Sequence, residues 1–153
     1  MIPVRFRVLG TPIPQGSMKA FAIRKGGRLT GGTVVTSGRD GPVRPWRQSI
    51  IDQVRDLNLR DREAGPVRVF IEFTLDRPKS HYGTGRNAGR VKDSAPAYPA
   101  VKPDIDKLTR AVLDALTEAG MWMDDAQVVD LQVTKRYTVA GFPPGAGIAV
   151  CDA

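Results

Sequence analysis

Alternation of apolar and polar residues predicts the strands of this chain. From Val4 to Val8 apolar and basic residues alternate, which indicates a strand with one buried and one basic face. Between Val67 and Leu75 every second residue is apolar, which predicts a second and clearer strand. The segment 126–137, which ends in basic residues, and the short segment 147–151 are also expected to be strands.

Apolar positions spaced three to four residues apart predict two helices. The first is expected from Pro45 to Leu57, since proline suits a first helical turn. The second is expected from about Asp104, as N-cap, to Ala119, with Gly120 ending it. This order of elements favours an α+β fold in which the helices pack against one small sheet. A chain of 153 residues suits a single domain, residues 1–153.

Two long segments show neither the alternation of a strand nor the three-to-four-residue spacing of a helix. Residues 10–44 hold eight glycines and six Lys or Arg, and we expect a mobile loop with a short hairpin through 29–35. Residues 77–102 hold six Lys or Arg, one acidic residue and interleaved aromatic residues. This second composition suits either a loop that wraps around a nucleic-acid backbone or a solvated, disordered insertion.

The charge balance indicates a polyanionic partner. The net charge is +7 and the pI is about 10.0, a profile that nucleic-acid-binding proteins share. One cysteine and one histidine exclude an intramolecular disulfide and a structural zinc site. We expect no membrane partner, because no stretch of about 18 apolar residues occurs. Arg5 and Arg7 interrupt the apolar start, so we expect no signal peptide and a cytoplasmic protein.

An acidic island interrupts this basic chain. Between Asp104 and Asp130 lie seven carboxylates and only two basic residues, with the pairs Asp104/Asp106 and Asp124/Asp125 standing out. Carboxylate oxygens suit Mg²⁺ or Mn²⁺. The helix between the pairs would be about 24 Å long, so they meet only through tertiary packing or not at all. The alternatives are a helix cap with a solvated acid, and a turn. Asp114 and Glu118 are expected on a solvated helix face.

Residues 102–116 (KPDIDKLTRAVLDAL) and 123–130 (MDDAQVVD) together resemble the RusA family of Holliday-junction resolvases. The resemblance implies an α+β domain with a mixed sheet and two main helices. It also implies a homodimeric, Mg²⁺-dependent endodeoxyribonuclease, with Mn²⁺ able to substitute. Such enzymes introduce paired symmetric nicks in four-way DNA junctions during recombination and repair, and are common in phages and prophages. No small-molecule cofactor is implied.

The resemblance also selects site residues. Asp104, Asp106 and Asp125 match the essential, metal-binding acids of the family, and Asp124 matches a neighbouring acid and is a further candidate ligand. Where the family often has lysine, this chain has Arg110, which stays protonated and so could stabilise phosphate charge but not act as a base. Lys107, one turn away, is the second candidate for that catalytic role.

The candidate DNA contacts come from two regions. The loop that contains Gln15, Ser17 and Lys19 matches the part of the family that contacts DNA. The arginine run that precedes the acids in some relatives is missing here, and the basic loop is expected to replace it through Arg86, Arg90, Lys92 and Lys102. Two other functions stay open: a structure-specific nuclease for forks or flaps, and a non-catalytic nucleic-acid-binding module.

Overall fold

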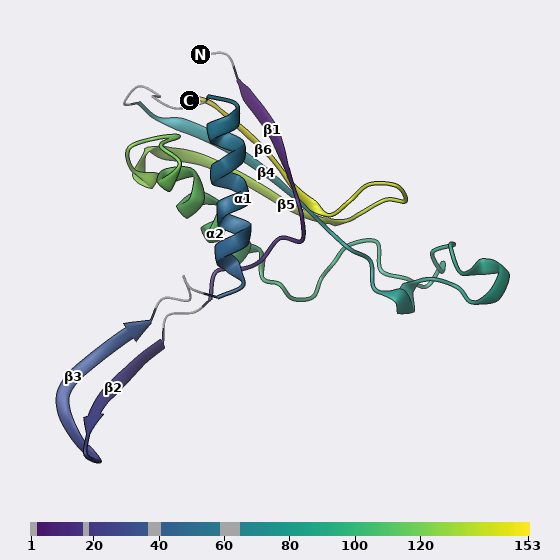
Figure 1. Cartoon of the computed structure of the whole chain (residues 1–153). Helices are drawn as coiled ribbons and strands as arrows, with labels where there is room; N and C mark the ends of the chain where they lie inside the picture. Colours follow the sequence, from purple (N-terminus) through teal and green to yellow (C-terminus); the bar gives the residue numbers. More distant parts are fainter. Residues whose placement is uncertain (1–2, 17–18, 37–40, 59–64) are drawn as a thin grey trace.

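Four strands form the central sheet (Figure 1). The computed structural model describes residues 3–16, 19–36, 41–58 and 65–153, with the side chains of 19–24 and 32–36 left out. The sheet has the order β1-β6-β4-β5, and β5 runs parallel to β4 while the other pairs are antiparallel. It is therefore the mixed sheet that the family resemblance implied. The strands are β1 Val4–Leu9, β4 Val67–Leu75, β5 Val128–Tyr137 and β6 Gly145–Asp152.

Two helices pack against one face of this sheet, α1 Val43–Asp56 and α2 Ile105–Glu118. Alternate residues of β4 are buried, and they join the apolar stripes of both helices in a single core. The opposite face of β4, which includes Arg68 and Phe70, is exposed. The predicted α+β fold is thus confirmed. In the described residues no helix is both long and apolar enough to cross a membrane.

A two-stranded hairpin stands apart from the sheet between β1 and α1. It consists of β2, Lys19–Lys25, and β3, Arg28–Thr36. The predicted hairpin through 29–35 was too short, because Gly26 and Gly27, with φ of 58° and 81°, form the tight turn that joins two longer strands. Figure 1 shows the hairpin extending away from the helices and the sheet.

Residues 77–102, called the basic arm below, leave the end of β4 and return to α2. Two short 3-10 helices, η2 Lys79–His81 and η3 Gly85–Asn87, and a bridge between Tyr82 and Val91 give the arm a regular backbone. Its base is fixed to β5 by Tyr137, whose ring lies 4.3 Å from the Arg77 guanidinium and 5.4 Å from the His81 ring. The arm is therefore folded, which replaces the alternative of a disordered insertion.

Candidate functional site

Asp104 stands where the basic arm meets α2. Its backbone is extended (φ −71°, ψ 136°), which confirms the predicted N-cap position, but its side chain makes no capping hydrogen bond. The carboxylate instead lies 3.3 Å from Lys107 Nζ, with both side chains about half exposed. Such an exposed pair contributes at most about 1 kcal/mol. The ion pair with Lys107 therefore holds the Asp104 carboxylate only weakly.

A lysine of β5 holds the backbone just before Asp104. Lys135 Nζ donates hydrogen bonds to the carbonyl oxygens of Val101, at 2.7 Å, and Pro103, at 2.9 Å. The Lys102–Pro103 peptide bond is cis. The segment that leads into α2 is thus tied to the edge strand of the sheet. Sequence reasoning missed this contact, because it joins residues more than 30 positions apart.

Asp106, in the first turn of α2, lines a cavity of about 530 Å³ beside β5. Arg110 and Asp114 follow it at steps of four residues and so lie on the same helix face. Asp125, from the segment after the helix, lines the same cavity. Asp106 and Asp125 therefore line one cavity through tertiary packing, as the length of the helix required. The remaining lining comes from Ile105, Thr109, Leu113, Leu131 and Val133.

The turn after α2 delivers Asp125 to this cavity. Gly120 ends the helix with φ of 80°, as predicted, and the chain reverses there. Asp124 then caps the short 3-10 helix η4, Asp125–Gln127, since its carboxylate accepts the Ala126 N–H at 2.8 Å. Gln127 completes the capping box and also donates to the Gly65 carbonyl at 2.9 Å. The cap occupies the Asp124 carboxylate, whereas the Asp125 carboxylate is exposed and makes no hydrogen bond within the part of the chain that the structure describes.

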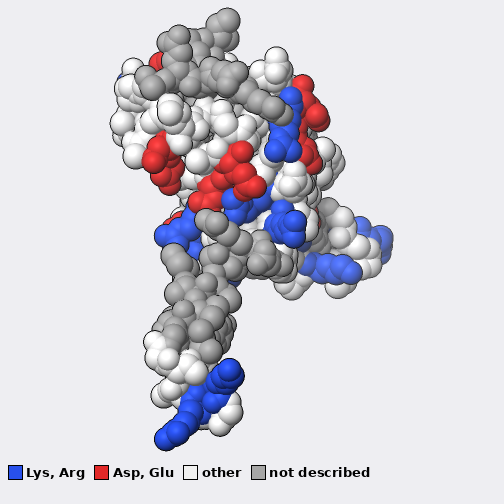
Figure 2. Space-filling model, turned by 60° about the vertical axis from the view of Figure 1, so that its left-hand side comes forward, with Lys and Arg blue, Asp and Glu red and all other residues white. Residues whose placement is uncertain are grey.

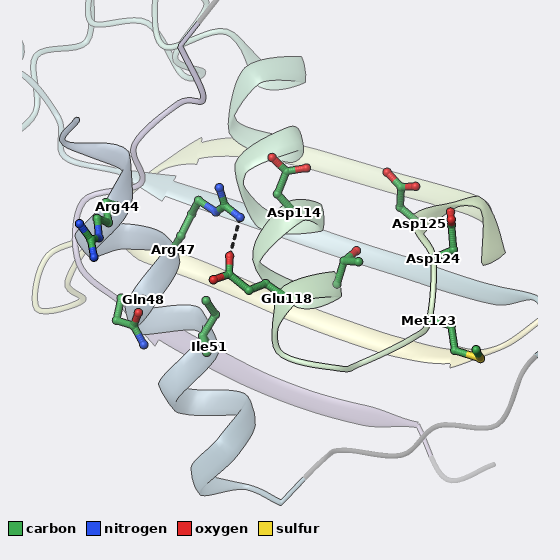
Figure 3. A pocket seen from close by; sticks show the side chains of 10 residues that line it. Arg44, Arg47, Gln48, Ile51, Asp114, Glu118, Met123, Asp124 and Asp125 are labelled. Carbon is green, nitrogen blue, oxygen red and sulfur yellow. Dashed lines mark hydrogen bonds and ion pairs between the residues drawn. The ribbon is translucent and has the colours of Figure 1, made fainter. Parts of the chain in front are cut away.

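A second cavity of about 670 Å³ adjoins the first and lies between α1 and α2 (Figure 3). Asp114 and Asp125 line both cavities. Figure 3 shows Arg47 of α1 reaching across to Glu118 of α2, and their side chains lie 2.7 Å apart. Glu118 therefore belongs to the packing of the two helices. Asp114 does not lie on a simple solvated face, and its four-residue spacing from Arg110 was the signal that could have found it.

The carboxylates around Asp106 fit a hard divalent cation by their chemistry. In the described residues no group of three or more His, Cys, Asp or Glu side chains is close enough to hold a metal by itself. Mg²⁺ normally takes only one or two carboxylates and completes its octahedron with waters and phosphate oxygens. Asp106 and Asp125 line one cavity and are of the residue type that such a site uses. Asp104 does not line this cavity and lies beside Lys107.

The residues predicted to contact DNA differ in how exposed they are. Gln15 is 6% exposed, and its backbone N–H donates to the Lys107 carbonyl, so it lies beneath the start of α2. Ser17 lies outside the described residues, and Lys19 begins β2 with its side chain not described. Figure 2 shows Asp and Glu on the body, interspersed with Lys and Arg, whereas the basic arm and the hairpin tip show Lys and Arg without acidic side chains in this view. The exposed basic residues of the arm are Lys79, Arg86, Arg90, Lys92 and Lys102, and the last four are those predicted to contact DNA.

Comparison with known proteins gives both a family and individual relatives. The model of the endodeoxyribonuclease RusA family matches residues 12–150. Crossover junction endodeoxyribonuclease RusA of Escherichia coli K12 is 55% identical over 38 residues, which are 25% of this chain and 32% of that protein. The enzyme of enterobacteria phage 82 matches to the same extent. The chain thus covers about a third of the length of these relatives.

A longer match is to the uncharacterized protein YqaN of Bacillus subtilis strain 168. It is 30% identical over 136 residues, which are 88% of each chain. The short matches have high identity and the long match has moderate identity. Both are similarities of this chain to other proteins, and the family match spans the hairpin, the basic arm and both acidic pairs.

Proposed function

Because this chain belongs to the RusA endodeoxyribonuclease family, we propose that it resolves four-way DNA junctions by paired, symmetric nicks. The reaction is hydrolysis of phosphodiester bonds with Mg²⁺ as cofactor and Mn²⁺ as substitute. One observation carries the proposal: Asp106 and Asp125, from acidic pairs on either side of α2, line the same cavity. The strongly basic charge of the chain supports a DNA substrate.

The acidic residues have distinct roles in this proposal. Asp106 and Asp125 would hold the cation from the two sides of the cavity, and Asp104 would turn from Lys107 to join them. While the site is empty, Lys107 would offset the negative charge of Asp104. A bound divalent cation would polarise the scissile phosphate and lower the pKa of an attacking water. The cap made by Asp124 would fix the direction of Asp125.

Arg110 is the candidate for stabilising the charge that develops on the phosphate. It lines the cavity between Asp106 and Asp114 on one helix face and is exposed. A guanidinium stays protonated and can hold two phosphate oxygens at once. Proton transfer from water therefore does not involve Arg110 in this mechanism. Lys107 lies one turn nearer to Asp104 and would act on the same phosphate.

Two copies of the chain would act together. A four-way junction has nearly two-fold symmetry and needs two cuts, so a homodimer with a two-fold axis places one site at each strand. Apolar side chains beside the cavity support a protein contact there, since Val129 is 62% exposed, Leu131 41% and Ile105 39%. Val129 and Leu131 belong to β5, which is an edge strand of the sheet.

Basic residues of the basic arm and of the β2–β3 hairpin would bind the duplex arms of the junction. Exposed residues of the basic arm would contact the phosphate backbone, and the start of β2 would add a further contact. Gln15 would support α2 from within rather than touch DNA first. The other predicted residues, Ser17, Lys19, Arg86, Arg90, Lys92 and Lys102, are the proposed DNA contacts. In the cell this activity would serve recombination and repair.

The test compares three DNA substrates at one salt concentration with Mg²⁺. Synthetic four-way junctions, Y-forks and linear duplex are incubated with the wild type and with Asp106→Asn and Asp125→Asn. We expect paired nicks in the junction by the wild type and a loss of at least a thousandfold in each variant, with junction binding retained. Asp130→Asn is the matched control, because Asp130 belongs to the same acidic island but is in register with Arg68.

The outcomes separate the alternatives. Faster cleavage of forks than of junctions would replace junction resolution by a fork or flap nuclease. Junction binding without Mg²⁺-dependent cleavage would indicate a non-catalytic module. Wild-type cleavage rates in both Asn variants would contradict the assigned site.

A further inference from the structure

The β2–β3 hairpin carries only positive charge. Its sequence from Lys19 to Thr36 contains four basic residues and no acidic one. Lys25 and Arg28 are exposed at the tip, which Figure 2 shows at the far end of the hairpin. The four basic residues are Lys19, Arg24, Lys25 and Arg28.

The tip pairs two cations that weaken the hairpin itself. Lys25 lies directly opposite Arg28 in the strand register, on either side of the Gly26-Gly27 turn. Like charges in directly opposite positions destabilise a strand pair. No side chain of the turn separates them from solvent, and a Cβ added at Gly26 or Gly27 would have no neighbour within 4 Å. This pair is therefore better explained by a polyanion outside the chain than by the stability of the hairpin.

The hairpin also lacks the support of a larger sheet. It forms its own two-stranded sheet, whereas the strands of the core form a separate one. A two-stranded hairpin alone is only marginally stable in water. A binding partner that contacts both strands would add the missing stabilisation. The positive charge selects nucleic acid over an apolar protein surface for this role.

We propose that the β2–β3 hairpin binds duplex DNA at a distance from the scissile phosphate, with Lys25 and Arg28 contacting phosphates on the two sides of the major groove. That groove is about 12 Å wide and admits a two-stranded ribbon. A glycine turn presents no side chain to the base edges, so the grip is independent of sequence. The inference deepens the proposed function, since it names the surface that holds one duplex arm of the junction.

The length of the hairpin sets where on the duplex it acts. The seven residues of β2 span roughly 23 Å at about 3.4 Å per residue. At about 3.4 Å per base pair this equals roughly seven base pairs. A junction arm clearly shorter than this would not reach the tip, whereas a longer arm would. Arm length is therefore a second variable, independent of mutation, that tests the same contact.

The experiment measures binding without divalent cation, so it does not depend on cleavage. Fluorescence anisotropy gives the affinity of the full chain for a labelled four-way junction over a series of salt concentrations. The test variant is Lys25→Ser/Arg28→Ser. The control is Arg5→Ser/Arg68→Ser, which removes two exposed cations from the outer sheet face and gives the same net charge, +7 − 2 = +5. Junction arms of about 20 and about 5 base pairs are compared.

With long arms we expect the test variant to bind roughly tenfold more weakly and its log–log salt slope to fall by about 2, because each phosphate contact contributes about 0.9. The control should keep the wild-type slope. With short arms the test variant and the wild type should coincide. Equal slopes for test variant and wild type with long arms would overturn the proposal. So would a changed oligomeric mass of the test variant at unchanged DNA binding, which would assign the hairpin to a second copy.

Failure of this proposal is distinct from failure of the proposed function. If the wild type cleaves junctions and the test variant keeps the wild-type salt slope, the hairpin proposal fails and the proposed nuclease function stands. If the wild type cleaves no DNA and the test variant shows the expected decrease in salt slope, the proposed nuclease function fails and the hairpin proposal stands.

Discussion

Lys135 Nζ donates a hydrogen bond of 2.9 Å to the carbonyl oxygen of Pro103, the residue before Asp104. A second bond reaches Val101, so one ammonium holds two carbonyls of the segment that leads into α2. A hydrogen bond to a charged group contributes about 1.5–3 kcal/mol, but only the bond to Pro103 is partly buried, and the bond to Val101 is exposed and contributes less. Lys135 is therefore a positioning residue for Asp104 and Asp106.

Lys135→Met is expected to raise the Mg²⁺ concentration needed for half-maximal cleavage by roughly tenfold, because the backbone that precedes Asp104 and Asp106 loses its hydrogen bonds to β5. Lys135→Arg should recover part of this loss. The measurement is a Mg²⁺ titration of junction cleavage. Arg136→Met is the control on the same strand, since Arg136 pairs with Glu72 at 3.2 Å with both side chains about half exposed. An equal shift in both variants would count against a specific role for Lys135.

Glu118→Ala should lower the free energy of unfolding by about 2 kcal/mol, because it leaves the Arg47 guanidinium unpaired. The Arg47 side chain is only 11% exposed, and its Nε already lacks a partner in the described residues. Urea unfolding followed by circular dichroism gives the change. Asp52→Ala removes an exposed ion pair with Arg55 at 4.0 Å and an exposed hydrogen bond from Gln48 at 2.7 Å, and should cost less than about 1 kcal/mol. A smaller cost for Glu118→Ala than for Asp52→Ala would contradict the assignment.

Periodicity predicted the elements whose two faces differ most. The strand expected at 67–75 is β4 to the residue, since every second side chain enters the core. Helix and strand ends were less certain, and α1 begins at Val43, two residues before Pro45. β5 begins at Val128 rather than 126, because η4 occupies the preceding residues. Residue propensities place such ends only to within one or two residues, because capping contacts decide where an element begins.

Contacts distant in sequence were beyond prediction. The shared cavity of Asp106 and Asp125 depends on the reversal at Gly120, and the length of α2 alone could only show that packing was required. Asp114 looked like part of a solvated face because nothing in the sequence shows which side of α2 the returning chain covers. The hairpin was underestimated because the sequence of its strands shows no regular alternation of apolar and polar residues, and the Gly26-Gly27 turn was its strongest signal.

Gly120→Ala is expected to destabilise the fold by about 1 kcal/mol through backbone strain alone. Gly120 has φ of 80°, and a Cβ there would meet nothing within 4 Å, so no clash contributes. The strain lies in the turn that places Asp125, and cleavage should fall by roughly tenfold. Gly89→Ala is the control, because its Cβ site is equally open and its φ is not positive. Thermal unfolding and junction cleavage are measured together, and a neutral Gly120→Ala would exclude the strain.

The neighbouring acids Asp124 and Asp125 should respond differently to the same change. Asparagine is as good an N-cap as aspartate, so Asp124→Asn should keep the Ala126 hydrogen bond and most of the cleavage rate. Asp124→Ala loses the cap and should cost about 1 kcal/mol of stability. Asp125→Asn should abolish cleavage at unchanged stability, because its exposed carboxylate makes no capping bond. A loss of cleavage in Asp124→Asn equal to that in Asp125→Asn would instead make Asp124 a ligand.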